Sequence, residues 1–569
     1  MCGIFGIIGA KQNAAEAVLN GLKKLEYRGY DSWGIAVSEK KTFLRERHVG
    51  KIGDAKTKLP SSTLGLGHTR WATHGGVTVG NTHPHLSCDR KICLVHNGIV
   101  ENFRYLKEKL INNHHFSSET DTEVALHLIE EKAKTRSFLA AVKDSFNEIT
   151  GMNALIAVSS QTGEMVAVKN GSPLIIGLGK NQNYISSDVW ALLDHTNQVI
   201  FMEDNQLALI SKGSVKLFNA KTGKAIKPKI NTLDWQAEQS RLGKFHHYME
   251  KEIYDQPKVL SSLANQNFRA INSLFKKDQK IYLLGCGTAY YAAFFAEYCF
   301  RLAGFSAEAV MASEFGKIIP LVNPKQLVIV FSQSGETLDV LHALRELKKK
   351  KIKILAITNV LGSSLYRLAD YQILLGAGQE MAVASTKAFT AKLTVILRLL
   401  GEKSDLIVKS GQILFDRKKI KQLAKKIKDS EHIFVVGRGF FYPLALEAAL
   451  KIKEVSYIHA EGFASGELKH GPIALIDKGV PCLVLAPGDY SREEMISCAY
   501  EMKARGGFII GVSSEDHPVF DVFLKINSFG PASAISAAII CQLLAYDLAV
   551  ARSLNPDKPR NLAKSVTVK

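Results

Sequence analysis

Cysteine at position 2 is the first residue whose type and place could do chemistry. The chain opens MCGIFGIIGA, and removal of Met1 would leave Cys2 with its thiol beside a free α-amino group. An α-amine titrates near pH ~8, so at neutral pH it can act as a general base for the neighbouring thiol. The alternative, a small apolar thiol packed in a core, stays open at this point. The opening therefore suggests a nucleophile that the rest of the chain must support.

The segment SQSGET, at 332–337, is a candidate phosphate site. It lies between an apolar run and an amphipathic pattern, where a helix N-terminus would offer free N–H groups and a partial positive charge. Further donors would come from Ser332, Gln333, Ser334 and Thr337. No lysine follows as in a nucleotide-binding P-loop, so a monophosphate is favoured over a nucleotide. Ordinary helix capping by Ser and Thr is the alternative.

Acid–base candidates follow further along the chain. Glu447, Lys451 and Glu454 are spaced by four and three, which places them on one face of a helix. Taken alone, this spacing favours an ion-pair ladder on a solvated surface. His470 lies in the glycine- and proline-bounded segment SGELKHGP, and a histidine there could move protons near neutral pH. Lys564, in the tail, could form a Schiff base if a dry pocket lowered its pKa.

The sequence shows two kinds of secondary-structure pattern, and the elements that they predict must position these residues. Residues 1–215 alternate short β-like runs with a few helical ones, which predicts an antiparallel α+β domain. Residues 216–245 are polar and are predicted to be a linker. Strand–loop–helix units follow, as in KIYLLGCGTAYYAAFFAEYCFRLAG, and are typical of a parallel sheet.

This second pattern occurs twice. HIFVVGRGFFYPLALEAALKIKE echoes the first unit, which predicts tandem α/β domains at 246–410 and 411–555, followed by a tail at 556–569. In the second copy, APGDYS replaces SQSGET, and its Asp489 would repel a phosphate. The repeat therefore predicts one sugar-phosphate site, with CGTA (286–289) and VAST (383–386) lining the same crevice.

Composition narrows the class of protein. The chain has 569 residues and a net charge of +19, but its lysines cluster on presumed helix faces without interleaved aromatic residues, so a nucleic-acid binder is the weakest alternative. Eight cysteines without a CxxC pair favour reduced thiols in a cytoplasmic protein over disulfides or a zinc site. The most apolar stretch, SAISAAIICQLLAYDLAVA, contains Asp547 and is expected to be a buried helix, and no secretory signal is evident.

The whole chain resembles the glutamine–fructose-6-phosphate aminotransferase (isomerizing) family, also called glucosamine-6-phosphate synthase. The motifs MCGIFGI, EYRGYDS, HTRWATHG, HNGIVEN and SETDTE resemble its glutaminase half, an N-terminal-nucleophile domain. The motifs SQSGET, VASTKAF, GELKHGP and PRNLAKSVTV resemble its two sugar-isomerase domains. The resemblance implies an enzyme that makes glucosamine 6-phosphate and glutamate from fructose 6-phosphate and glutamine.

The glutaminase motifs imply roles residue by residue. Cys2 matches the nucleophile, and Asn97 with the N–H of Gly98 matches the groups that stabilise the oxyanion. The matching glutamine contacts are Arg70 for the carboxylate, Asp121 for the α-amine, and Thr73 and His74. Trp71 matches the residue that closes an internal ammonia channel.

The isomerase motifs also imply a role for each matching residue. The matching phosphate contacts are Ser332, Gln333, Ser334 and Thr337, and the matching sugar contacts are Thr288, Val383 and Ser385. Glu454 matches the base that moves a proton between C1 and C2, with Glu447 and Lys451 supporting it. His470 matches the ring-opening residue, donated by a neighbouring subunit, and Lys564 the imine-forming lysine. In this context the surface-ladder interpretation of the 447–454 helix no longer holds.

Two positions depart from the family pattern. Trp33 stands where a small residue is usual, and Ala289 where serine is frequent. The resemblance implies a homodimer and neither a metal nor an organic cofactor. The alternatives are a phosphoribosyl-type amidotransferase, for which no acidic-pair loop is found, and a sugar-phosphate-sensing regulator, which would not need Glu454, His470 and Lys564.

Overall fold

The structure is a computed structural model that describes residues 2–11, 13–72, 74–233, 242–412 and 416–565. It divides into two compact units, which are described separately. The first comprises residues 1–239 together with 563–569, and the second comprises residues 240–562.

The first unit is built on two antiparallel sheets. The order of the first sheet is β15-β11-β9-β10-β1-β4-β2-β3, and that of the second is β14-β13-β12-β8-β7-β6-β5. The strands of the first sheet are β1 (Gly3–Ile8), β2 (Ser32–Glu39), β3 (Thr42–Val49), β4 (Leu64–Arg70), β9 (Ile175–Gly179), β10 (Gln182–Ser186), β11 (Gln198–Phe201) and β15 (Asn231–Thr232). Those of the second are β5 (His85–Leu86), β6 (Ile92–Gly98), β7 (Asn153–Ser159), β8 (Glu164–Asn170), β12 (Gln206–Ile210), β13 (Val215–Asn219) and β14 (Ala225–Ile226).

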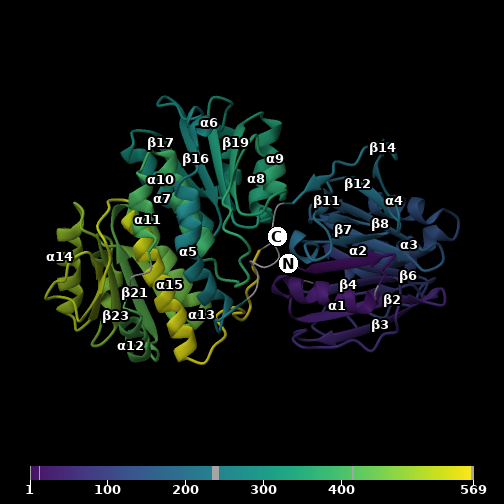
Figure 1. The fold of residues 1–569 in the computed structure, drawn as a ribbon, viewed down its shortest axis with the longest axis horizontal. Coiled ribbons are helices and arrows are strands. Elements are labelled where there is room, and N and C mark those ends of the chain that lie inside the picture. Colours follow the sequence, from purple (N-terminus) through teal and green to yellow (C-terminus); the bar gives the residue numbers. More distant parts are fainter. Residues whose placement is uncertain (1, 12, 73, 234–241, 413–415, 566–569) are drawn as a thin grey trace. The chain divides into compact units, whose positions relative to one another are not determined.

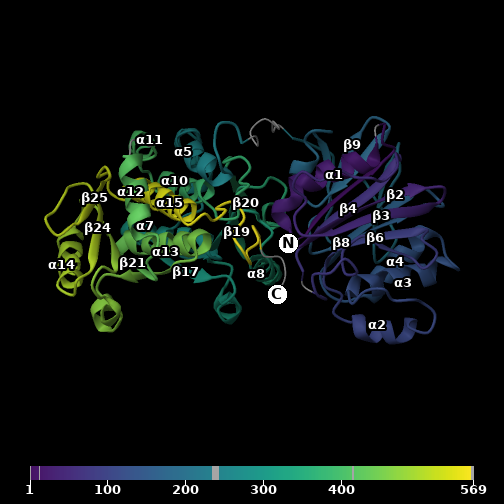
Figure 2. The same ribbon diagram turned by 90° about the horizontal axis from the view of Figure 1, so that it is seen from below.

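Helices cover the outer faces of these sheets. They are α1 (Ala14–Leu25), α2 (Phe103–Leu110), α3 (Asp121–Ala133) and α4 (Phe138–Glu148). Figure 2 shows α1 on one side of the paired sheets and α3 and α4 on the other. Apolar side chains of both sheets, such as Ile4 and Ile156, meet between them in a buried core. The predicted antiparallel α+β class is confirmed, and the opening strand is β1, directly after Cys2.

The second unit contains two parallel sheets with the same topology. Their orders are β17-β16-β18-β19-β20 and β22-β21-β23-β24-β25, so the predicted repeat is confirmed. The first sheet consists of β16 (Lys280–Gly285), β17 (Ser306–Met311), β18 (Leu327–Ser332), β19 (Lys353–Thr358) and β20 (Tyr371–Leu374). The second consists of β21 (His432–Gly437), β22 (His459–Ala464), β23 (Pro481–Ala486), β24 (Phe508–Ser513) and β25 (Val522–Lys525).

One large core joins the two parallel sheets through the helices between them (Figure 1). The helices of this unit are α5 (Tyr248–Ala264), α6 (Arg269–Asn272), α7 (Thr288–Leu302), α8 (Leu338–Lys349), α9 (Ser364–Leu368), α10 (Lys387–Leu399), α11 (Ser404–Ser410), α12 (Arg417–Ile427), α13 (Tyr442–Ser456), α14 (Arg492–Lys503) and α15 (Ser533–Ala551). Within this set, α8 and α9 cover the outer face of the first sheet and α14 that of the second.

The long apolar helix α15 runs through this core. Residues 530–551 are long and apolar enough to cross a membrane, but 89% of the most apolar window is buried inside the protein. The expected buried helix is therefore confirmed.

Residues 216–245, expected as a linker, contain structure where they are described. The strands β13, β14 and β15 extend into or lie within this range, and they pair with the sheets of the first unit. Their shortness and polarity explain why the sequence pattern misses them. Within the described part of the tail, residues 563–565 group with the first unit. The other domain limits stay predictions.

Candidate active site

Cys2 is held between two strands at the edge of a pocket. The next residue, Gly3, donates its N–H to Thr69 Oγ1 on β4 at 3.0 Å. The Cys2 thiol faces the backbone of Trp71, whose N–H donates to Sγ at 3.3 Å and whose carbonyl oxygen lies 3.6 Å from Sγ. The Cys2 carbonyl accepts from Arg28 Nε at 3.2 Å and from Asn97 Nδ2 at 3.1 Å. Cys2 is thus fixed by its backbone, while its sulfur is turned to the pocket.

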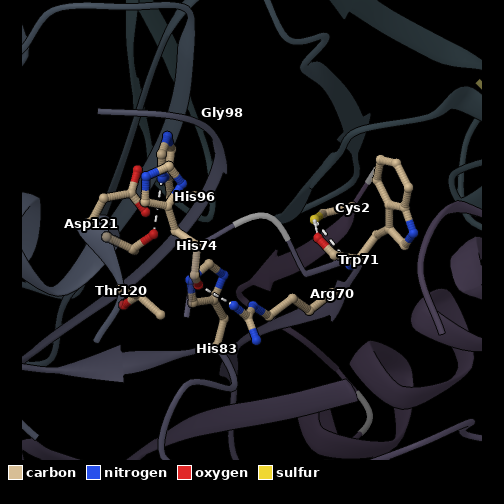
Figure 3. A pocket seen from close by; sticks show the side chains of 10 residues that line it. Cys2, Arg70, Trp71, His74, His83, His96, Gly98, Thr120 and Asp121 are labelled. Atoms are coloured by element: carbon tan, nitrogen blue, oxygen red, sulfur yellow. Dashed lines mark hydrogen bonds between the residues drawn. The ribbon is translucent and has the colours of Figure 1, made fainter. Parts of the chain in front are cut away.

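The pocket beside Cys2 has a volume of about 290 Å³, which includes open solvent at its mouth. The residues that line it are Cys2, Arg70, Trp71, His74, His83, His96, Gly98, Thr120, Asp121 and Thr122. Figure 3 shows Cys2 and Asp121 apart, with the side chains of Arg70 and His74 between them. A nucleophile, a cation and an anion therefore share one small pocket, which fits an α-amino acid with a reactive side chain.

Arg70 and Asp121 are placed by backbone groups. Arg70, 3% exposed at the end of β4, donates to the carbonyls of His74, Gly75 and Gly76. Burial lowers its pKa, an effect that the nearby Cys2 and Asp121 oppose. Asp121 is the first residue of α3 and accepts from the Val100 N–H at 2.6 Å.

Asn97 is oriented by a buried histidine. Its Oδ1 lies 3.1 Å from His68 Nε2, and this nitrogen also lies 3.1 Å from the carbonyl of His96. The contact leaves the Nδ2 group of Asn97 directed at Cys2. Gly98, which lines the pocket, has φ +138°, and a Cβ there would lie 2.2 Å from the Met152 carbonyl. Position 98 therefore needs glycine, whose N–H stays close to the site.

In the second unit, the segment 332–337 forms the predicted loop between β18 and α8. Ser332 Oγ accepts from the Gly335 N–H at 3.0 Å, and Gly335 has φ +68°. Thr337 is the N-cap residue of α8, yet its side chain makes no capping hydrogen bond. The Ser334 hydroxyl likewise accepts from the Glu336 N–H at 3.2 Å, so local capping accounts for the two serines of the loop but not for Thr337. The phosphate assignment stays a prediction that this geometry supports.

The helix α13 buries its charged face. Lys451 is 1% exposed and Glu447 2%, so the surface-ladder interpretation is wrong. Lys451 Nζ pairs with Glu454 and lies 3.7 Å from Glu447 Oε1, which accepts from Thr288 Oγ1 at 3.2 Å. Burial raises the pKa of Glu447 to about 7, although Lys451 opposes the shift. Burial lowers the pKa of Lys451, but the two carboxylates outweigh it and the net pKa is raised.

Comparison with known proteins identifies related domains in both the N-terminal and the C-terminal part of the chain. A glutamine amidotransferase domain model matches residues 68–194, and a SIS domain model matches residues 273–400 and 426–552. The glutamine–fructose-6-phosphate aminotransferase [isomerizing] of Thermococcus kodakarensis is 40% identical over 602 aligned residues, covering 100% of both chains. That of Acinetobacter baylyi is 39% identical, again over 100% of both chains. The chain belongs to the glutamine–fructose-6-phosphate aminotransferase (isomerizing) family.

A solved structure from this family covers the second unit. The C-terminal domain of the Francisella tularensis glucosamine-fructose-6-phosphate aminotransferase is 32% identical and has a TM-score of 0.50. It covers 56% of this chain and 100% of its own. The chain is therefore an enzyme with the fold class of the aminotransferase family, a glutaminase domain followed by two sugar-isomerase domains.

The residues expected from the aminotransferase family to contact the sugar lie at or just before the starts of two helices of the second unit, α7 and α10. Thr288 begins α7 beside Glu447, and Val383 and Ser385 lie in the loop before α10. Ser385 donates to Glu380 Oε2 at 3.0 Å, while Glu380 Oε1 accepts from the Thr386 N–H at 2.8 Å. The sequence analysis did not identify Glu380, whose carboxylate accepts these bonds and so holds the loop in place.

His470, Lys564 and Thr73 are placed differently. His470 is exposed at the end of a short turn after β22. Lys564 is partly buried in the tail segment that groups with the first unit. Thr73 lies outside the described residues. The roles of all three stay predictions.

Four buried histidines around the glutamine pocket were also missed. Burial lowers the pKa of His68 and His85 to about 3, and it lowers those of His83 and His96 as well, so all are neutral at pH 7. They come from β4, from the loop before β5 together with β5, and from β6, so no single local pattern marks all four.

The two departures from the family pattern are accommodated locally. Trp33 on β2 is 3% exposed and stacks on His48, with ring centroids 4.5 Å apart. Ala289 is 9% exposed in the first turn of α7. The indole of Trp71 extends away from His96 and Asp121 in Figure 3.

Proposed function

We propose that this chain converts D-fructose 6-phosphate and L-glutamine to D-glucosamine 6-phosphate and L-glutamate. The observation that carries the proposal is the similarity over the full length of the relatives, because it includes both the Cys2 pocket and the 332–337 loop. The two sites supply what the reaction needs, a nucleophile with amino-acid anchors and a phosphate cradle beside buried acid–base groups.

In the glutamine half, the Cys2 sulfur attacks the side-chain amide carbon while Arg70 holds the α-carboxylate and Asp121 the α-amine. A C–S bond forms, the C–N bond breaks, and ammonia leaves after taking up a proton. Water then hydrolyses the thioester to glutamate. Asn97 Nδ2, 3.1 Å from the Cys2 carbonyl, is close enough to donate to the oxyanion, together with the Gly98 N–H.

In the sugar half, the 332–337 loop holds the phosphate, with Thr288, Val383 and Ser385 contacting the sugar. His470 of a neighbouring subunit opens the ring, and Lys564 forms an imine at C2, releasing water. Ammonia displaces the lysine, and Glu454 moves a proton from C1 to C2. Lys451 pairs with Glu454 and orients that carboxylate for the proton transfer.

The remaining parts of the proposal concern the context of the reaction. Ammonia would pass through an internal channel gated by Trp71, because protonation in water would remove its nucleophilicity. The product would supply amino-sugar synthesis. The enzyme would act as a homodimer in the cytoplasm, without a cofactor in the reaction.

Product analysis tests the proposal. Protein with Met1 removed is mixed with L-glutamine and fructose 6-phosphate, and both products are measured. We expect glucosamine 6-phosphate in step with glutamate, and loss of both in Cys2→Ala supplied with glutamine. Glutamate without amino sugar would refute the sugar half. Glutamine hydrolysis that survives in Cys2→Ala would refute the nucleophile assignment.

A further inference from the structure

Four potential metal ligands meet in the first unit, apart from the residues that line the glutamine pocket. Cys88 lies in the loop between β5 and β6, and His114 follows α2. His127 and Glu130 lie one turn apart on α3. One ligand atom from each residue lies within 4.8 Å of all the others.

The spacing of these atoms is that of a tetrahedral metal site. Bonds of about 2.0–2.3 Å to nitrogen, oxygen and sulfur imply ligand–ligand edges of roughly 3.3–3.7 Å. Cys88 Sγ lies 3.8 Å from His114 Nδ1 and 3.9 Å from His127 Nδ1. Glu130 Oε2 lies 3.1 Å and 2.8 Å from the same two nitrogens. Small movements would bring all four atoms to a common centre.

Neighbouring groups orient these ligands. Glu130 Oε1 accepts from the Cys88 N–H at 3.0 Å, which turns Oε2 toward the histidines. On the far side of the His114 ring, Nε2 lies 2.9 Å from Glu131 Oε2, whereas His127 Nε2 lies 3.9 Å from Glu123 Oε1, beyond hydrogen-bond distance. A carboxylate behind a ligating imidazole fixes the ring and strengthens it as a ligand.

We propose that Cys88, His114, His127 and Glu130 form a structural site for Zn²⁺ or a similar transition metal. Thiolate and imidazole ligands select such metals over Mg²⁺ and Ca²⁺, which prefer oxygen. One thiolate and one carboxylate balance the charge of a divalent ion. Four protein ligands close the coordination sphere, as in structural rather than catalytic zinc sites.

The site would tie three segments of the chain together. It joins the loop before β6, the end of the α2 segment and the middle of α3. Asp121, the expected anchor for the glutamine amine, is the first residue of α3. The metal would therefore stabilise the helix that presents Asp121, without taking part in the reaction. The sequence pattern does not indicate a metal site, because the four ligands are dispersed along the chain and no CxxC pair occurs.

Metal analysis of the full-length protein tests this proposal. The protein is treated with a chelator and reloaded with Zn²⁺ or Co²⁺, and bound metal is counted by elemental analysis after gel filtration. We expect about one ion per chain, and for Co²⁺ a tetrahedral spectrum with a sulfur charge-transfer band. Cys88→Ser should lose this band and the stoichiometric metal, and because Cys88 is exposed, the variant should still fold.

Two further variants complete the test. Glu131→Gln should keep the stoichiometry but weaken affinity by roughly 10- to 100-fold, because it alters only the group behind His114. His115→Ala, which changes the exposed neighbour of His114, should bind metal like the parent. Absence of bound metal in the parent, or equal binding and an unchanged band in Cys88→Ser, would leave only an ion-pair network here and overturn the proposal. Neither result bears on whether the enzyme makes glucosamine 6-phosphate.

Discussion

Replacing Glu447 by Gln should change how the stability of the second unit depends on pH. Burial raises the pKa of Glu447 from 4.5 to about 7, a difference worth roughly 3 kcal/mol between the two protonation states. Because the folded pKa is the higher one, the stabilisation is fully present below pH 4.5 and is lost as pH rises through 7. Gln is neutral at every pH and can still accept from Thr288.

As pH rises, the free energy of unfolding of the wild type should therefore fall relative to that of Glu447→Gln. Between pH 5 and pH 8 the difference should change by roughly 2–3 kcal/mol in favour of the variant. Urea unfolding followed by helical circular dichroism, at pH 5, 6, 7 and 8, measures it. Subtracting the two profiles removes the titrations that both proteins share.

A matched control separates burial from the loss of a charge. The Glu493 side chain is 85% exposed on α14, so Glu493→Gln should give a profile parallel to that of the wild type. The reasoning would be refuted if Glu447→Gln also ran parallel to the wild type, because Glu447 would then titrate in the folded protein as it does in the unfolded chain.

Three other variants probe the remaining sites. In Gly335→Ala the new Cβ would lie 2.1 Å from Ser363 Oγ, and the backbone there has φ +68°, which alanine rarely adopts. The resulting strain of about 1–3 kcal/mol should distort the loop and raise KM for fructose 6-phosphate roughly tenfold or more. Its glutamine hydrolysis should stay unchanged, and an unchanged KM would contradict the phosphate assignment. Trp33→Ala should lower the free energy of unfolding by about 3–5 kcal/mol, measured in urea, because the buried indole leaves a cavity beside His48; a loss under about 1 kcal/mol would show that the site collapses. Lys564→Ala should abolish the borohydride-trapped adduct with the sugar, and an undiminished adduct would place the imine on another lysine.

Local pattern was enough to predict much of the fold. β-Branched and aromatic residues predicted the opening strand, and strand–loop–helix units predicted the two parallel sheets, because both signals are local in sequence. The short strands β13–β15 were not predicted. Of their side chains only Leu217 is buried, so little hydrophobic alternation marks them, and β15 pairs with β11 rather than with a neighbouring strand.

The candidate sites likewise divide into those that local sequence could locate and those that depend on tertiary contacts. The 332–337 loop could be located because its donors are contiguous. The burial of Lys451 could not be predicted. The spacing of Glu447, Lys451 and Glu454 is the same on a solvated helix as on one that packs against α7 and α15. The Cys88 cluster also depends on tertiary contacts, because its ligands come from three separate segments.

The two units should respond to acid in opposite ways. His68 and His85 have folded pKa values of about 3 and an ordinary value of 6.5, so the unfolded chain takes up protons first as pH falls. Their contribution to stability is fully present above pH 6.5 and is lost toward pH 3, and at pH 5 each has cost about 2 kcal/mol. Glu447 acts in the opposite sense, because its neutral form favours the folded second unit at low pH.

Intrinsic fluorescence can follow this difference selectively. Of the four tryptophans of the chain, Trp33, Trp71 and Trp190 lie in the first unit, and Trp235 is outside the described residues. From pH 7 to pH 5, the urea midpoint seen by tryptophan fluorescence should fall by more than the midpoint seen by helical circular dichroism. His68→Gln should reduce the fall in the fluorescence midpoint, because Gln keeps a donor for Asn97 Oδ1 without a titrating ring. Equal shifts of both midpoints in the wild type would mean that the buried histidines do not control the acid response of the glutaminase unit.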